Sequence, residues 1–112
     1  MKILVIESSP HKNGSSNLLA DYFIRGAREA GHTVNIFDAA RAVLHPCLGC
    51  DVCGMLSACC QNDDMARVKE QLLGADMVVF VTPLYYFGMS AQLKTLIDRF
   101  YSFNNQFKLP TP

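Results

Sequence analysis

Two short apolar runs constrain the fold of this chain most strongly. The first run, residues 2–6, is apolar in every residue after Lys2, and the second run, residues 77–81, is apolar throughout. Both consist of Ile, Leu, Val, Met and Phe, and many of these residues are β-branched. A strand with one face in solvent alternates apolar and polar residues, whereas a strand covered on both faces is apolar throughout. We therefore expect both runs to be central strands of a parallel sheet whose two faces are covered.

Three other stretches have the periodicity and the end signals of helices. Residues 15–30 predict the first helix. Residues 63–73 predict a second helix, which Asp63 or Asp64 can cap, and Ser90 can cap a third. The apolar faces expected on these helices are Leu18, Leu19, Tyr22, Phe23 and Ala27 on the first, Met65, Val68 and Leu72 on the second, and Leu93, Leu96, Ile97 and Phe100 on the third.

The order of these elements predicts the topology. Residues 33–38 alternate between apolar and polar, which suits an edge strand, so the chain reads β-α-β-α-β-α. Such alternation implies a three-layer α/β/α arrangement with a parallel sheet. Right-handed crossovers and the edge position of the second strand favour the order 2-1-3. This is the first half of the flavodoxin-like order 2-1-3-4-5.

The third predicted strand lacks a neighbour. Residues 77–81 are apolar on both faces, yet no later segment of this sequence can pair with their far edge. An exposed apolar edge is an aggregation hazard. We expect one domain over residues 1–112 that is truncated before strands four and five. The alternative is that a partner subunit supplies the neighbour.

Composition and charge exclude several classes of function. The ten basic and ten acidic residues give zero formal net charge, and the basic residues are scattered rather than clustered as in nucleic-acid-binding proteins. No apolar run approaches the ~20 residues that span a bilayer, and no signal-peptide pattern opens the chain. We expect a cytoplasmic protein that binds neither nucleic acid nor membrane.

The loop after the first strand is predicted to bind an anion. In open α/β sheets, ligands bind where the strand order reverses, which here lies between the loops after strands one and three. Residues 8–17 provide hydroxyl groups, Gly14 and the start of a helix, and together these favour a phosphate. The alternative is an ordinary helix cap within a polar loop.

This loop resembles that of the NADPH-dependent FMN reductase-like flavoproteins, which typically reads Gly-Ser-Pro-Arg-Lys-x-Gly-[Ser/Asn]-[Ser/Thr]. Here residues 9–16 read Ser-Pro-His-Lys-Asn-Gly-Ser-Ser. The resemblance implies that the FMN phosphate is held by Ser9, His11, Ser15, Ser16 and Asn17, with a contribution from Lys12. Ser8 replaces the usual Gly, and His11 replaces the usual Arg. Because a neutral His lacks the permanent charge of Arg, we expect weaker or pH-dependent FMN binding, partly compensated by Lys12.

The loop after the third strand is rich in aromatic residues. A flavin ring needs apolar surfaces for stacking and backbone groups for its polar edge. The alternative is that these aromatic side chains pack against another subunit or the core. The segment resembles the family's ring-binding loop, Thr-Pro-x-Tyr-x-x-x-x-[Ser/Pro], and ends here at Ser90. The residues that the resemblance implies for the flavin ring are Pro83, Leu84, Tyr85, Tyr86, Phe87 and Gly88.

All five cysteines lie within residues 47–60, inside a long segment at 45–62 with weak periodicity. Thiolates at this spacing can converge on an iron–sulfur cluster, and four could equally bind tetrahedral zinc. The segment resembles the C-x2-C-x2-C-x(4–7)-C motif of iron–sulfur flavoproteins. The resemblance implies that Cys47, Cys50, Cys53 and Cys59 ligate a [4Fe–4S] cluster, with Cys60 as an alternative fourth ligand. Related reductases also keep such cysteines as thiols without a cluster.

These features favour an FMN-dependent oxidoreductase or electron-transfer flavoprotein. It would take electrons from NAD(P)H or a reduced carrier and pass them to a quinone, an oxygen species or another acceptor. No acid or base residue is required, because the redox chemistry belongs to the cofactor. We expect small-molecule redox substrates or carrier proteins as partners, and a homo-oligomer. The alternatives are a carrier flavodoxin, although such proteins are usually acidic and the pI here is about 6.8, and a non-flavin module with structural zinc.

Overall fold

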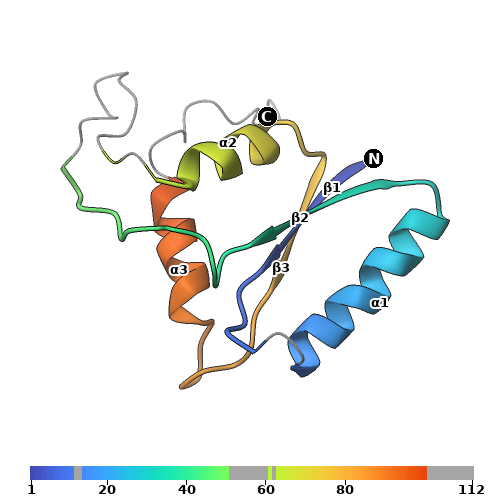
Figure 1. The fold of residues 1–112 in the computed structure, drawn as a ribbon, viewed down its shortest axis with the longest axis horizontal. Coiled ribbons are helices and arrows are strands. Elements are labelled where there is room, and N and C mark those ends of the chain that lie inside the picture. Colours follow the sequence, from blue (N-terminus) through green and yellow to red (C-terminus); the bar gives the residue numbers. More distant parts are fainter. Residues whose placement is uncertain (12–13, 51–60, 62, 101–112) are drawn as a thin grey trace, which may run out of the picture.

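The structure is a computed structural model, and it describes residues 1–11, 14–50, 61 and 63–100. Its sheet has three parallel strands, β1 (Lys2–Glu7), β2 (Thr33–Asp38) and β3 (Met77–Val81), in the order β2-β1-β3. The register aligns Val5 with Ile36 on one side and with Val79 on the other. Figure 1 shows the carboxyl ends of all three strands at one edge of the sheet. The predicted order 2-1-3 is confirmed.

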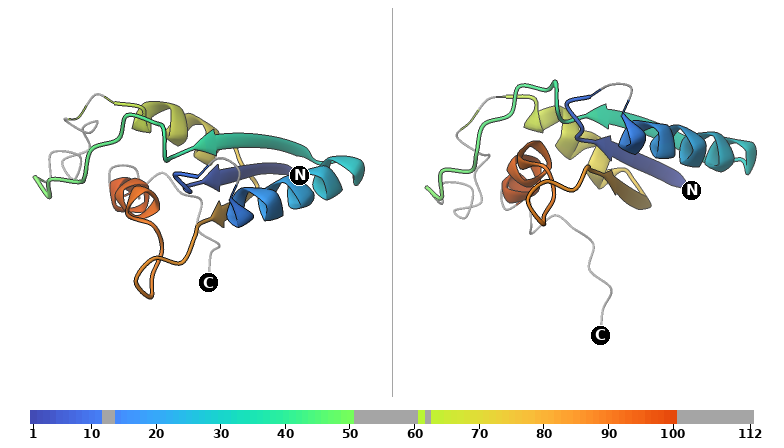
Figure 2. Two further views of the ribbon diagram at one scale, coloured as in Figure 1. Left: turned by 60° about the horizontal axis from the view of Figure 1, so that its bottom comes forward. Right: turned by 90° about the horizontal axis from the view of Figure 1, so that it is seen from below.

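Three helices cover the two faces of this sheet: α1 (Ser15–Glu29), α2 (Met65–Leu73) and α3 (Ala91–Asp98). Helix α1 lies on one face, and α2 and α3 lie on the other (Figures 1 and 2). In β1, Ile3 and Val5 pack toward α1, whereas Leu4 and Ile6 pack toward α2 and α3, and all four side chains are buried. Each such burial is worth about 1.5–3 kcal/mol. The continuous apolar run is thus explained by coverage on both faces.

The helix starts follow the predicted caps, with one refinement. Ser90 Oγ accepts a hydrogen bond from the Leu93 N–H at 3.3 Å and so caps α3. At α2, Asp64 occupies the cap position, but its side chain accepts no hydrogen bond from the first turn of the helix. The carboxylate of Asp63 accepts from the Met65 N–H at 3.1 Å instead. Of the two aspartates predicted as caps, Asp63 is therefore the one that accepts a hydrogen bond from a backbone N–H at the start of α2.

The predicted apolar face of α1 is wrong for four of its five residues. The side chains that pack on the sheet are Ala20 and Ile24, with Ala27 half-buried beside them. Four larger apolar residues of α1 are exposed: Leu18 (56%), Leu19 (71%), Tyr22 (62%) and Phe23 (41%). The contact with the sheet consists of one large residue, Ile24, between two alanines, so the hydrophobicity of individual side chains does not identify the inner face. The outer face of α1 remains an apolar surface.

The far side of β3 is the second exposed apolar region. Met77 is 40% exposed and Phe80 is 43% exposed, although both belong to a run that reads as a covered strand. Among the described residues, no strand pairs with this edge of β3. Within the same residues, no helix is long and apolar enough to cross a membrane.

Candidate functional site

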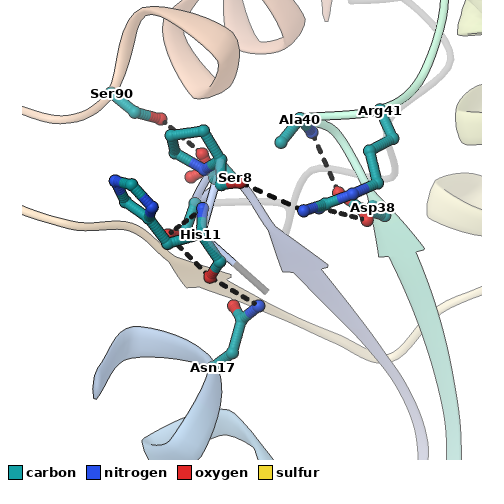
Figure 3. Close-up of polar contacts among 9 residues, drawn as sticks. Ser8, His11, Asn17, Asp38, Ala40, Arg41 and Ser90 are labelled. Atoms are coloured by element: carbon teal, nitrogen blue, oxygen red, sulfur yellow. Dashed lines mark hydrogen bonds and ion pairs between the residues drawn. The ribbon is translucent and has the colours of Figure 1, made fainter. Parts of the chain in front are cut away.

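Ser8 joins the two loops that follow β1 and β3. Its N–H and its Oγ both donate to the carbonyl of Val81, at 3.0 and 2.9 Å, and its own carbonyl accepts from Ser90 Oγ at 3.1 Å. Ser8 and Ser90 are both fully buried. Figure 3 shows Ser90 directed at Ser8 from the start of α3. Ser8 is thus a structural residue that fixes one loop against the other.

The carbonyl of His11 organises the loop after β1. It accepts hydrogen bonds from Gly14 N–H at 3.2 Å, from Asn17 Nδ2 at 3.4 Å and from Ser9 Oγ at 3.3 Å. The hydroxyl of Ser9 in turn accepts from the His11 N–H at 3.2 Å. Ser9 is 4% exposed, whereas the His11 residue as a whole is exposed. The described part of the loop is therefore held by the backbone of His11 and the hydroxyl of Ser9, and Asn17 contributes a side chain from α1 (Figure 3).

Gly14 lies where this loop meets the helix. A Cβ added at Gly14 would stand 3.3 Å from the carbonyl oxygen of His11, which is closer than ordinary van der Waals contact. Gly14 is also the N-cap residue of α1, and the first turn contains no acidic residue. The helix start, with Ser15 exposed and Ser16 half-buried, thus faces the loop with its positive dipole end unneutralised by a carboxylate.

Arg41 links the same loop to the end of β2. Its Nη2 donates to the carbonyl of Pro10 at 3.1 Å, and its Nη1 forms a 2.8 Å ion pair with Asp38. The other carboxylate oxygen of Asp38 accepts from the Ala40 N–H at 3.1 Å. Figure 3 shows these contacts at the end of β2. The sequence analysis missed Arg41, because nothing local connects it with Pro10.

Glu7, the last residue of β1, lies among other carboxylates. Burial raises the pKa of Glu7 above its usual value, and the nearby charges of Asp21 and Asp38 raise it further, while Arg41 lowers it. The charge of Glu7 is therefore unfavourable in the folded protein at neutral pH.

The loop after β3 ends in a tight aromatic hairpin. Tyr85 and Gly88 exchange a pair of backbone hydrogen bonds of 2.8 and 3.0 Å. Between them, Tyr86 has φ 44° and Phe87 has φ 63°, the left-handed conformation of a type I′ turn that normally selects Asn and Gly. Such a conformation costs about 1–3 kcal/mol per bulky residue. Tyr86 is 96% exposed and Phe87 is 93% exposed, so the strained turn presents two aromatic rings to solvent.

The base of this aromatic loop is fixed. Thr82 Oγ1 accepts from the Ser90 N–H at 2.9 Å, which closes the loop at its two ends. Within the loop, Pro83 and Gly88 are half-buried, whereas Leu84 and Tyr85 are exposed. Since Ser90 also contacts Ser8, the structure brings the bases of both predicted loops together at the carboxyl end of the sheet.

The cysteine segment is described in part. Cys47 and Cys50 are exposed, and Gly49 between them has φ 65°. Cys53 and Cys59, like Lys12 in the first loop, lie outside the described residues. Among the residues that are described, no group of three His, Cys, Asp or Glu side chains is close enough to hold a metal ion.

The two ends of the cysteine segment are tied together. Val43 N–H donates to Asp64 Oδ2 at 2.7 Å, and Asp64 N–H donates back to the Val43 carbonyl at 2.9 Å. Gln61 Nε2 donates to the carbonyl of Pro46 at 2.9 Å. The chain before Cys47 and the chain after residue 60 thus form a hydrogen-bonded stem, which the sequence pattern did not predict.

Known proteins are similar to this chain in sequence and in fold. A model of the NADPH-dependent FMN reductase family matches residues 1–109. Two iron–sulfur flavoproteins of Methanocaldococcus jannaschii are 37% identical over 100 residues and 33% identical over 99 residues, in each case 88% of this chain. The chain spans about half the length of these curated relatives, 50% and 51%.

A solved structure gives the same result. A Klebsiella pneumoniae protein described as a candidate quinone reductase superposes with a TM-score of 0.73 at 30% identity, over 93% of this chain and 46% of that one. The topology, the two loops at one edge of the sheet and the family match agree. The chain therefore belongs to the NADPH-dependent FMN reductase family.

Proposed function

We propose that this chain binds FMN at the carboxyl end of the sheet and serves as the flavin-binding part of an NAD(P)H-dependent oxidoreductase. The observation that carries the proposal is the junction at Ser8 and Ser90, which holds the loop predicted to bind an anion beside an exposed aromatic loop. FMN has the two chemical parts that these loops would recognise, a phosphate and a flat apolar ring. When bound, FMN supplies the hydride and electron chemistry, while the protein binds and orients it.

The described residues fit the phosphate. The start of α1 offers backbone N–H groups and a positive dipole end, and Gly14 leaves the space that a Cβ would fill near His11. The phosphate would lie against Ser15, Ser16 and Asn17, with Ser9 shaping the loop from beneath. Because His11 is exposed and holds the loop through its backbone, its side chain remains available to the phosphate; Lys12 is assigned here on its sequence position alone.

The aromatic loop fits the ring. Its exposed surface consists largely of Leu84, Tyr85, Tyr86 and Phe87, and the strained turn keeps the last two side chains out of the core. Pro83 and Gly88 provide backbone close to the base of the loop. A flavin ring that stacks on this surface would cover rings that are now in solvent and would offset part of the strain.

The cysteine segment is proposed to hold a [4Fe–4S] cluster through Cys47, Cys50, Cys53 and Cys59. Two observations support it: Cys47 and Cys50 are exposed at the two-residue spacing of cluster ligands, and the relatives named iron–sulfur flavoproteins are more than 30% identical to this chain. Electrons would pass from NAD(P)H or a reduced carrier to a quinone or another acceptor. Such thiolate chemistry requires a reducing compartment, so we place the protein in the cytoplasm.

The exposed apolar surfaces suggest that further chain completes the site. The outer face of α1 and the free edge of β3 together expose Leu18, Leu19, Tyr22, Phe23, Met77 and Phe80. We propose that strands beyond this segment, or a second copy of the protein, pair with β3 in the working molecule, which would act as a homo-oligomer.

An absorption spectrum of the purified protein, prepared without oxygen, tests the proposal. Flavin gives two resolved visible bands, and a cluster adds broad brown absorption. We expect the flavin bands in the isolated protein or after addition of FMN. A protein that stays colourless and does not take up FMN would contradict the proposed function, whereas flavin bands without brown absorption would contradict only the cluster.

A further inference from the structure

A buried ion pair lies between α3 and the start of α2. Arg99 caps the end of α3, and its Nη1 lies 2.6 Å from Oδ2 of Asp63, with 1% of each side chain exposed. Burial by itself would raise the pKa of Asp63, but the hydrogen bonds from Arg99 and from the backbone N–H groups of His45 and Met65 outweigh it and hold the pKa below its usual value. Because apolar residues often replace a buried ion pair without loss of stability, stability alone does not explain this one.

The pair holds both backbone groups of His45. Arg99 Nη1 donates to the His45 carbonyl at 3.0 Å, and Asp63 Oδ2 accepts from the His45 N–H at 3.0 Å. Arg99 and His45 are 54 positions apart, and Asp63 and His45 are 18 apart, so the contact closes a loop that includes the whole cysteine segment. His45 is two residues before Cys47, which places the contact directly beside the first proposed ligand.

The pair therefore completes the stem of the cysteine segment. The bonds between Val43 and Asp64 form one layer of this stem, and the bond between Gln61 and Pro46 forms another. Arg99 and Asp63 form the buried layer between them. A flexible loop loses chain entropy when its ends meet, so a stem that is already closed removes that cost from metal binding.

We propose that Arg99 is a positioning residue for the cysteine segment: with Asp63 it fixes the backbone of His45 and thereby holds Cys47 where the segment binds a metal. This inference rests on the proposed metal site. It also assigns α3 a connecting role, since Ser90 at its start fixes the FMN loops and Arg99 at its end fixes the cysteine stem.

The test uses the reduced, metal-free protein and Co²⁺ as the probe, with the thiolate–cobalt absorption as the readout. In Arg99→Met, which keeps the length of the side chain but removes the hydrogen bonds, we expect Co²⁺ binding to weaken at least tenfold. Arg25→Met is the matched control, because Arg25 is exposed on α1, where it lies over the Tyr22 ring, on the face of the sheet opposite α2 and α3. It should change Co²⁺ binding less than twofold.

Hydrogen exchange separates positioning from general stability. In Arg99→Met we expect exchange of the His45 N–H to accelerate at least tenfold more than exchange of the Val5 N–H in β1, which reports the stability lost because Asp63 is left without its partner. We also expect Cys47 to react faster with iodoacetamide. Arg99→Lys retains a charged donor and should fall between the two proteins; it also serves if Arg99→Met does not fold.

Two results would overturn the inference. One is wild-type Co²⁺ binding and wild-type exchange at His45 in the Arg99 variants. The other is equal acceleration at His45 and Val5, which would show that Arg99 only stabilises the fold. If the wild-type protein binds no Co²⁺, the proposed metal site fails, and the positioning of His45 and Cys47 is then decided by exchange and alkylation.

Discussion

The two loops at the carboxyl end of the sheet are built in opposite ways. In the loop after β1, Ser8 and Ser9 are buried, and their hydroxyl groups bond to the protein itself. In the loop after β3, Tyr86 and Phe87 are almost fully exposed on a strained turn. In the described part of the first loop the side chains of Ser8 and Ser9 are bonded within the protein, whereas in the second loop the backbone is fixed but the two rings contact mainly each other and solvent. In the proposed site, phosphate recognition would therefore be preformed, whereas ring recognition would depend on contact with the ligand or with further chain.

Removing the link between the loops should have the largest effect. In Ser90→Ala, α3 loses its cap and the Ser8 carbonyl loses a buried donor, so we expect a loss of about 2 kcal/mol in the free energy of unfolding by urea. Thr95→Ala is the control, because the Thr95 hydroxyl only bonds back to Ala91 within α3. If both variants lose the same small amount, the two loops are not joined through Ser90.

Relieving the strained turn should separate stability from binding. The double variant Tyr86→Asn/Phe87→Gly supplies the residues that a type I′ turn prefers, so we expect a gain of about 1–2 kcal/mol in unfolding free energy. FMN affinity should fall in the same protein because the ring loses its stacking surface. Urea denaturation and FMN fluorescence quenching measure the two quantities. Unchanged FMN affinity would show that the turn does not contact the ring.

Adding a side chain at Gly14, in the loop after β1, should weaken binding of the FMN phosphate. A Cβ at Gly14 would press on the His11 carbonyl, so we expect Gly14→Ala to weaken FMN binding about tenfold, or ~1.4 kcal/mol. At Gly26, also in α1, a Cβ meets nothing within 4 Å. Gly26→Ala should leave FMN binding unchanged and stabilise the helix by about 0.5–1 kcal/mol. Equal FMN affinity in both variants would show that the space at Gly14 is not needed for phosphate binding.

The smallest effect is expected at Glu7 and depends on pH. Because the folded-state pKa of Glu7 is raised, ionisation destabilises the folded protein, and this penalty appears as the pH rises through the folded pKa. Glu7→Gln should therefore be more stable than wild type at pH 7 and equally stable at about pH 3, well below the ordinary pKa of a glutamate, where Glu7 is neutral in the folded and the unfolded state. Thermal unfolding across this pH range measures the difference. A constant difference at all pH values would show that charge is not the cause.

Local patterns predicted the elements of this fold well. The strands at 33–38 and 77–81 have the predicted bounds, and Ser90 caps α3, because periodicity and capping depend on neighbouring residues. The inner face of α1 could not be predicted in this way, since Ala20 and Ile24 pack on the sheet whereas the equally apolar Leu19 is exposed. The choice of residues at a helix–sheet contact depends on the partner surface, which a single sequence does not contain.

The sequence predicted the two loops of the candidate site but not the long-range hydrogen bonds that hold the surrounding chain in place. Arg41 reaches Pro10 across 31 positions and Arg99 reaches His45 across 54, and no periodic signal marks such pairs. The role of Ser8 could not be predicted either, because its hydroxyl donates to the carbonyl of Val81 on another strand. Lys12, Cys53 and Cys59 lie outside the described residues, so their assignments stay predictions.

The most direct test of the central claim compares FMN with riboflavin, which has the same ring but no phosphate. Titration of the purified protein with each flavin, followed by fluorescence quenching, measures both affinities. If the start of α1 holds the phosphate, FMN should bind at least tenfold more tightly than riboflavin, and added inorganic phosphate should compete with FMN. Equal affinities for the two flavins, or no binding of either, would contradict a phosphate site at this loop.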